Sequence, residues 1–88
     1  MSEASTTTDH KTIRKWVEAR GGRPSKVSDS ADDGGILRID FGEKEPNLEE
    51  VSWDEFFEIF DDRKLAFLHQ DQTEAGKESR FNKFVARH

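Results

Sequence analysis

Hydrophobic side chains in the first quarter of the chain follow the spacing of an α-helix. Ile13, Trp16 and Val17 lie three and four positions apart, so a helix would place all three on one face. The glycine pair at positions 21–22 is typical of a helix end, because glycine readily adopts the left-handed conformation found there. We therefore predict an α-helix over about residues 10–20.

The same spacing recurs in a run of four aromatic residues in the second half of the chain. Ser52 and Glu55 have the separation of a capping box, in which each side chain accepts a hydrogen bond from an otherwise unpaired backbone amide. We therefore predict a second helix that begins after Ser52 and ends near the acidic pair at 61–62. The apolar face of this helix consists of Trp53, Phe56, Phe57 and Phe60.

Three short segments have the alternation or the apolar content of β-strands. Residues 37–41 alternate apolar and polar side chains, and residues 25–27 can pair with them as a hairpin across a polar loop at 28–35. Residues 65–68 are apolar on both faces, which is typical of a strand in the middle of a sheet. We expect one core, whose predicted members are Trp16, Leu37, Ile39, Trp53, Phe56, Phe57, Phe60 and Phe67.

At the two ends of the chain the pattern predicts different behaviour. Residues 1–8 are polar and lack periodicity, so we expect a disordered tail. Phe81, Phe84 and Val85 have helical spacing, which favours a short C-terminal helix over a strand. The predicted fold is therefore a single α+β domain over residues 9–88. A three-stranded, mostly antiparallel sheet is packed by two main helices, and the short C-terminal helix follows.

The composition limits how large the core of this domain can be. Charged residues make up 38% of the chain and hydrophobic residues only 32%, which is close to the composition of disordered proteins. Seven phenylalanines and two tryptophans favour folding, because each aromatic side chain can bury about 150–250 Å². The chain has no cysteine, and no apolar run approaches ~18 residues. We therefore expect a soluble cytoplasmic protein without disulfides and without a membrane partner.

The net charge of −5 conceals three blocks of different sign. Residues 1–27 and residues 63–88 each carry six basic and three acidic residues, whereas residues 28–62 carry two basic and thirteen acidic residues. These blocks could pair with one another within the fold, which is the interpretation that we favour. Alternatively, both basic ends could form one surface for an anionic partner such as nucleic acid.

Four basic residues in and after the first predicted helix are the candidate contacts to an anion or a partner. In the segment 20–23, Arg-Gly-Gly-Arg, the glycines would let a phosphate approach the backbone and the arginines would bind it. However, these glycines end a helix, whereas phosphate loops open one, so an ordinary helix end explains the same residues. The candidates are Arg14, Arg20, Arg23 and Lys26.

No pattern of catalytic or metal-ligating residues is recognisable in the sequence. His10, His69 and His88 share no short spacing, so a zinc site would need them to meet by coincidence in the fold. The acidic segment at 29–34 fails as a calcium loop, because Ala31 occupies a position that must supply an oxygen ligand. We therefore expect no metal, no cofactor and no enzymatic activity.

Several segments together resemble a family of small, largely uncharacterised bacterial proteins. The resemblance covers about residues 9–87, and some members of that family carry the label 1,4-alpha-glucan branching enzyme. It implies no catalytic residue here, since branching enzymes act through a (β/α)₈ barrel, which takes about 250 residues. At most it implies an accessory protein to carbohydrate metabolism. The segments that carry the resemblance are Asp9–Pro24, Gly35–Phe41, Val51–Phe57 and Leu65–Leu68.

The sequence thus favours a small non-enzymatic binding or adaptor module whose partner is another protein. A nucleic-acid-binding module that uses the basic N- and C-terminal segments is the alternative, and an accessory role in carbohydrate metabolism is a third. The two leading hypotheses differ in one structural respect. Binding of nucleic acid needs a basic patch that is left unpaired, whereas pairing of the basic ends with the acidic middle would repel nucleic acid.

Overall fold

The computed structural model describes residues 4–27, 37–42, 48–73 and 75–87 of the 88-residue chain. These residues form two helices and six strands, so the predicted α+β class is confirmed. In chain order the elements are β1 (Ala4–Thr7), α1 (His10–Ala19), β2 (Arg23–Val27), β3 (Leu37–Asp40), β4 (Leu48–Glu50), α2 (Trp53–Asp62), β5 (Leu65–Gln70) and β6 (Asn82–Ala86).

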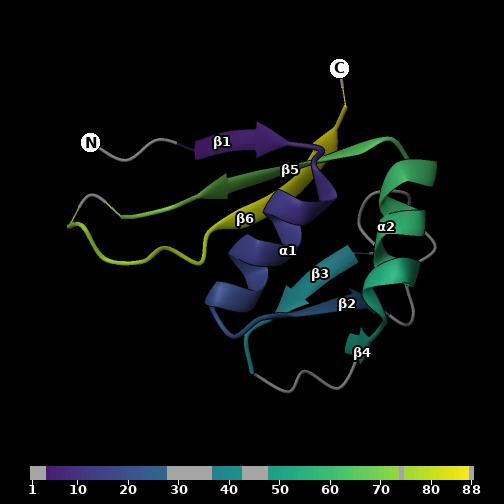
Figure 1. Ribbon diagram of the computed structural model, residues 1–88, viewed down its shortest axis with the longest axis horizontal. Coiled ribbons are helices and arrows are strands. Elements are labelled where there is room, and N and C mark those ends of the chain that lie inside the picture. Colours follow the sequence, from purple (N-terminus) through teal and green to yellow (C-terminus); the bar gives the residue numbers. More distant parts are fainter. Residues whose placement is uncertain (1–3, 28–36, 43–47, 74, 88) are drawn as a thin grey trace.

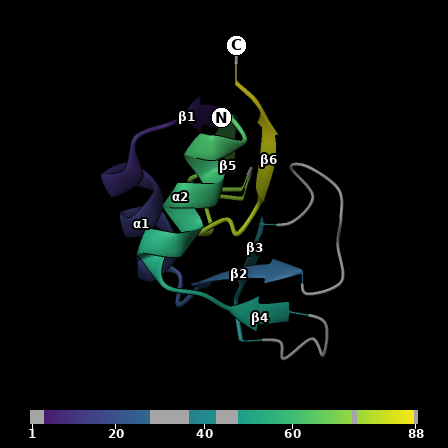
Figure 2. The same cartoon turned by 90° about the vertical axis from the view of Figure 1, so that its right-hand side faces the viewer.

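The described strands form two antiparallel sheets of three strands each, where the sequence predicted a single three-stranded sheet. Sheet A has the order β1-β5-β6, and sheet B has the order β3-β2-β4. Sheet A lies above sheet B in Figure 1, with α1 passing in front and α2 at the side. Both helices lie on one side of β5 and β6, as the second view shows (Figure 2). Sheet A therefore has one face against the helices.

One hydrophobic core joins the helices to both sheets. The ring of Phe67 on β5 lies 5.4 Å from the ring of Trp16 on α1, and the ring of Phe84 on β6 lies 5.7 Å from that of Phe56 on α2. All eight residues predicted for the core belong to this cluster or pack against it, which confirms that prediction. The buried members are Ile13, Trp16, Val17, Leu37, Val51, Phe56, Phe60, Leu65 and Phe67.

Both predicted helices are confirmed, and each begins after a capping side chain. The Asp9 carboxylate accepts hydrogen bonds from the backbone amide of Thr12, at 2.9 Å, and from its hydroxyl. These hydrogen bonds hold the pKa of Asp9 below its usual value. The Ser52 hydroxyl accepts from the Glu55 amide at 3.1 Å. However, the Glu55 carboxylate accepts from Lys26 instead of closing the capping box.

The end of α1 depends on a close approach of its backbone to sheet B. Gly21 has a φ of 71°, which is the left-handed conformation expected after a helix. A β-carbon on Gly22 would lie 2.8 Å from the Ile39 side chain and 2.9 Å from that of Val17. The second glycine is therefore needed for packing, and phosphate binding is not required to explain it.

The prediction of a disordered tail is wrong for Ala4–Thr7, which form β1. This strand pairs antiparallel with β5, with Ala4 opposite Gln70 and Thr7 opposite Phe67. Its side chains are mostly exposed, so burial leaves no periodic signal in the sequence. The strand is held by the backbone of β5, which would otherwise present unpaired amides and carbonyls at its edge.

The prediction of a C-terminal helix is also wrong, since this segment forms β6. Phe84 packs into the core, whereas Val85 points to the other side of the sheet, opposite Ala66. Apolar residues on both faces of a short strand imitate the three- and four-residue spacing of a helix. Residues 48–50, for which the sequence predicts no strand, form β4 beside β2. The predicted loop at 28–35 lies outside the described residues. The two strands of the predicted hairpin on either side of it, β2 and β3, are paired as expected.

Candidate functional site

Arg20, one of the four basic candidates, is occupied in holding the fold together. Its Nε donates to the carbonyl oxygen of Ser79 at 2.6 Å, and its Nη2 donates to that of Asp71 at 2.9 Å. Its Nη1 donates to the carbonyl oxygen of Trp16 at 3.0 Å, and the guanidinium lies 4.1 Å from the centre of the Trp16 ring. Arg20 therefore fastens the end of α1 to the connection between β5 and β6.

The other three basic candidates each lie beside a carboxylate. Lys26 makes the shortest of these contacts, and the hydrogen bond to Glu55 raises the pKa of the Lys26 ammonium group. The structure does not bring the four candidates together as one unpaired patch. The pairs are Arg14 Nε with Glu18 Oε2 at 3.2 Å, Arg23 Nη1 with Glu50 Oε1 at 3.8 Å, and Lys26 Nζ with Glu55 Oε2 at 2.9 Å.

The basic C-terminal block also contacts the acidic middle of the chain. Nη2 of Arg87 lies 3.1 Å from one carboxylate oxygen of Asp61, and Nε2 of His10 lies 2.9 Å from the other. Partial burial raises the pKa of Asp61, but the hydrogen bonds from His10 and Arg87 together outweigh it and hold the pKa below its usual value. The His10 ring stacks on Phe57 with ring centres 4.1 Å apart. These contacts tie together the start of α1, the end of α2 and the end of β6.

The described residues contain neither a metal-binding cluster nor a membrane-spanning helix. Within residues 4–27, 37–42, 48–73 and 75–87, no three His, Cys, Asp or Glu side chains are grouped so that they could hold a metal ion. Among the same residues, no helix is long and apolar enough to cross a membrane. His10 and His69 lie at separate places in the fold, and His88 is outside the described residues.

The face of sheet A that points away from the helices is the candidate functional site. Side chains alternate across a strand, so Leu65 and Phe67 enter the core while Ala66 and Leu68 point to this outer face. Residues directly opposite one another share a face, and the register adds the neighbours on β1 and β6. The outer face of sheet A thus includes Thr6, Ala66, Leu68, Lys83 and Val85.

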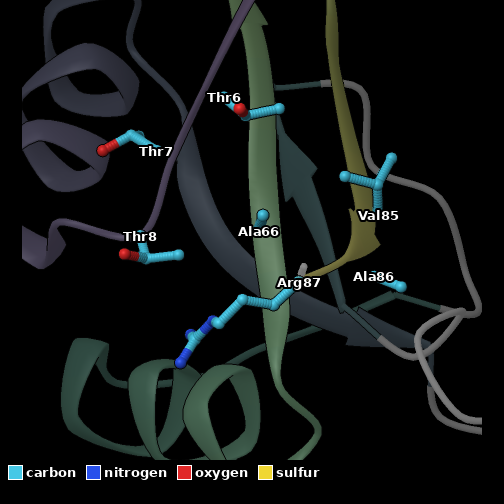
Figure 3. A pocket seen from close by; sticks show the side chains of 7 residues that line it. All are labelled: Thr6, Thr7, Thr8, Ala66, Val85, Ala86 and Arg87. Carbon is cyan, nitrogen blue, oxygen red and sulfur yellow. The ribbon is translucent and has the colours of Figure 1, made fainter.

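A hollow of about 700 Å³ lies on the outer face of sheet A. Figure 3 shows Ala66 and Val85 side by side on β5 and β6, Thr6 of β1 further along the sheet, and the Arg87 side chain crossing the end of β5 toward α2. The small Ala66 side chain is only 7% exposed and forms the floor of the hollow. The complete lining is Thr6, Thr7, Thr8, Ala66, Val85, Ala86 and Arg87.

The outer face of sheet A combines apolar character with a lack of negative charge. Leu68 and Val85 are half-buried, and neither belongs to the core cluster. Strands β1, β5 and β6 contain no Asp or Glu, although the whole chain has nineteen. Lys83 is exposed and makes no ion pair with any residue that the structure describes. The face therefore suits an apolar or negatively charged ligand.

Sequence reasoning missed this face because it interpreted the apolar residues on both faces of the strand only as a sign of a central position in the sheet. The residues 65–68 were expected in the centre of a sheet, which the order β1-β5-β6 confirms. A central strand lies between two other strands, but its two faces need not both be covered. The face of β5 that the helices do not cover could be recognised only once both helices were placed on the other side of the sheet.

Comparison with known proteins assigns no family to this arrangement. No family model matches the chain, no curated protein matches its sequence, and no solved structure matches its fold. The resemblance to the small bacterial family therefore stays a prediction, and the function is inferred from the geometry alone.

Proposed function

We propose that this protein is a small non-enzymatic binding or adaptor module of the cytoplasm, and that its partner is another protein. The observation that carries the proposal is the outer face of sheet A, where half-buried Leu68 and Val85 flank a hollow floored by Ala66. A partner that covered this face would remove apolar surface from water, which is the main driving force of protein association. Binding of a partner there would disturb the fold little, because the hydrophobic core lies on the other face of the sheet.

The pairing of basic residues supports a protein partner over nucleic acid. Arg23 and Lys26 face carboxylates of β4 and α2, and Arg20 spends its hydrogen bonds on backbone carbonyls. A phosphate would have to displace these contacts, whereas affinity for nucleic acid depends on cations that can neutralise phosphates. Phe81, which is 48% exposed two positions before Lys83, is the feature that favours nucleic acid as the alternative, since it could stack on a base. An accessory role in carbohydrate metabolism rests on the family resemblance alone.

Affinity capture from native lysate with matched variants tests the proposal. The wild-type protein and the Val85→Glu variant are compared, because Val85 forms one wall of the hollow and contributes no buried core contact. Ala19→Glu is the control, since it adds the same charge at an exposed position on α1. We expect a protein that is recovered by the wild type and by Ala19→Glu but is lost with Val85→Glu.

Two other results would count against a protein partner on this face. Equal recovery with Val85→Glu, in a variant whose circular dichroism matches the wild type, would place the binding elsewhere. Recovery that disappears after nuclease treatment would favour the nucleic-acid module, and replacing Phe81 by Ser should then abolish it.

A further inference from the structure

We propose that the segment bound by the outer face of sheet A is acidic, with an apolar side chain flanked by carboxylates. This inference rests on the proposed function and specifies the chemistry of the partner. It follows from two properties of the same face, namely the shape and lining of the hollow and the charges around it.

The hollow, at about 700 Å³, is large enough for several residues of a peptide, and its centre is suited to an apolar side chain. Its floor is the methyl group of Ala66, with Val85 beside it on β6 and Thr6 further along the sheet on β1 (Figure 3). These are carbon-rich surfaces, although the threonine hydroxyls give the rim some polar character. An aliphatic side chain placed over Ala66 would contact carbon atoms from all three strands of sheet A. The site lacks an aromatic residue on which a base could stack, since Phe81 is not part of its lining.

Two cations lie at this face, and one of them, Lys83, makes no ion pair with a described residue. Arg87 lines it, and its guanidinium is held by the carbonyl oxygen of Leu65 at 3.0 Å and the carboxylate of Asp61 at 3.1 Å. Asp61 balances the charge of Arg87, but Nη1 of Arg87 makes no hydrogen bond to the described residues and can donate to a carboxylate. Lys83 stands on the same face beside Leu68 and has no partner among the described residues.

The distribution of acidic residues gives this arrangement its selectivity. The net charge of the chain is −5, so at long range an acidic partner is repelled by the molecule as a whole. Sheet A has no acidic residue in its strands, and it is therefore the region where an acidic segment meets least repulsion. Complementary charge of this kind mainly sets specificity and the rate of association, while burial of the apolar side chain supplies the affinity.

A phage-displayed library of random peptides, selected against the purified full-length chain, tests the proposed chemistry. We expect the enriched peptides to share an apolar residue with Asp or Glu on both sides. The most enriched peptide is then synthesised and titrated into ¹⁵N-labelled protein. The largest amide shifts are expected at Ala66, Leu68, Lys83 and Val85.

Charge reversal provides the quantitative arm of the experiment. Lys83→Glu is expected to weaken binding of that peptide by about tenfold, because it replaces attraction by repulsion. Lys15→Glu changes the net charge equally at an exposed position on α1, and it should leave the affinity unchanged within about twofold. Urea unfolding of both variants checks that the fold is intact.

The inference is overturned if no peptide is enriched, if the enriched peptides lack acidic residues, or if Lys83→Glu and Lys15→Glu act alike. Tighter binding of an oligothymidine, with displacement of the peptide, would also overturn it in favour of nucleic acid. These results differ from a failure of the proposed function. If a protein is still captured from lysate in a way that depends on Val85, the outer face of sheet A remains the binding face, and only the acidic chemistry of the partner is refuted.

Discussion

Sheet A and sheet B use charge in different ways. In sheet B, Arg23 on β2 lies 3.8 Å from Glu50 on β4, and Lys26 lies 2.9 Å from Glu55 on α2. In sheet A the strands carry no acidic residue, and the one lysine makes no ion pair with a described residue. Arg23 and Lys26 of sheet B are therefore used within the molecule, whereas Lys83 of sheet A is available to a partner. The number of basic or acidic residues in a segment therefore does not by itself indicate where a partner binds.

The two faces of sheet A should differ most strongly in stability. Phe67→Ala removes a fully buried ring from the inner face and is expected to cost about 3–5 kcal/mol, enough to unfold so small a domain. Val85→Thr on the outer face should cost less than about 1 kcal/mol, since Val85 is half-buried outside the core. Urea denaturation followed by tryptophan fluorescence measures both. A cooperative transition near the wild-type midpoint in Phe67→Ala would refute the assignment of the inner face.

The arginines on either side of the glycine pair should differ next. Arg20→Ala breaks hydrogen bonds to three backbone carbonyls and is expected to destabilise the domain by about 2–3 kcal/mol. Arg23→Ala removes only an exposed contact of 3.8 Å and should be close to neutral. Arg20→Lys should restore only part of the loss, because an ammonium group cannot match the guanidinium geometry. Equal unfolding midpoints for Arg20→Ala and Arg23→Ala would show that Arg20 does not hold the two parts of the fold together.

Asp61 provides a test by pH, because it links α1, α2 and β6. Its pKa lies below the ordinary value of 3.8 in the folded state, so its contribution to stability is present above that value. This contribution is lost as the pH falls from about 3.8 through the lower folded pKa. Unfolding midpoints in urea should therefore fall less steeply below pH 4 in Asp61→Asn than in the wild type. Parallel curves for the two proteins would show that His10 and Arg87 do not stabilise the carboxylate.

The sequence predicts the parts of this fold whose burial follows one period. The apolar stripes of α1 and α2 lie against the core on one side only, so their helical spacing is unambiguous. Strands β1 and β6 could not be found in the same way. The side chains of β1 are mostly exposed, and β6 is apolar on both faces, so neither has the alternation of a half-covered strand.

The candidate site was hidden from sequence reasoning for a related reason. The charge of four basic residues made them candidates, namely Arg14, Arg20, Arg23 and Lys26. Their partners are identifiable only from the fold, and these are the carboxylates of Glu18, Glu50 and Glu55 and the carbonyls bound by Arg20. The outer face of sheet A consists of small and aliphatic residues on three strands that are far apart in the chain. No local motif joins these residues, and only strand pairing brings them together.

A pair of matched charge reversals gives the finest test of the comparison between the sheets. Lys26→Glu removes the hydrogen bond to Glu55 and adds repulsion from Glu55 and Glu49, so it should lower the unfolding midpoint measurably. Lys83→Glu makes the same change in net charge but breaks no ion pair with a described residue, and it should alter stability by less than about 0.5 kcal/mol. Urea unfolding at low and high salt separates the causes, since salt should recover part of the loss in Lys26→Glu by screening the repulsion. If Lys83→Glu were the more destabilising variant, Lys83 would stabilise the fold, and it would no longer indicate a surface that is available to a partner.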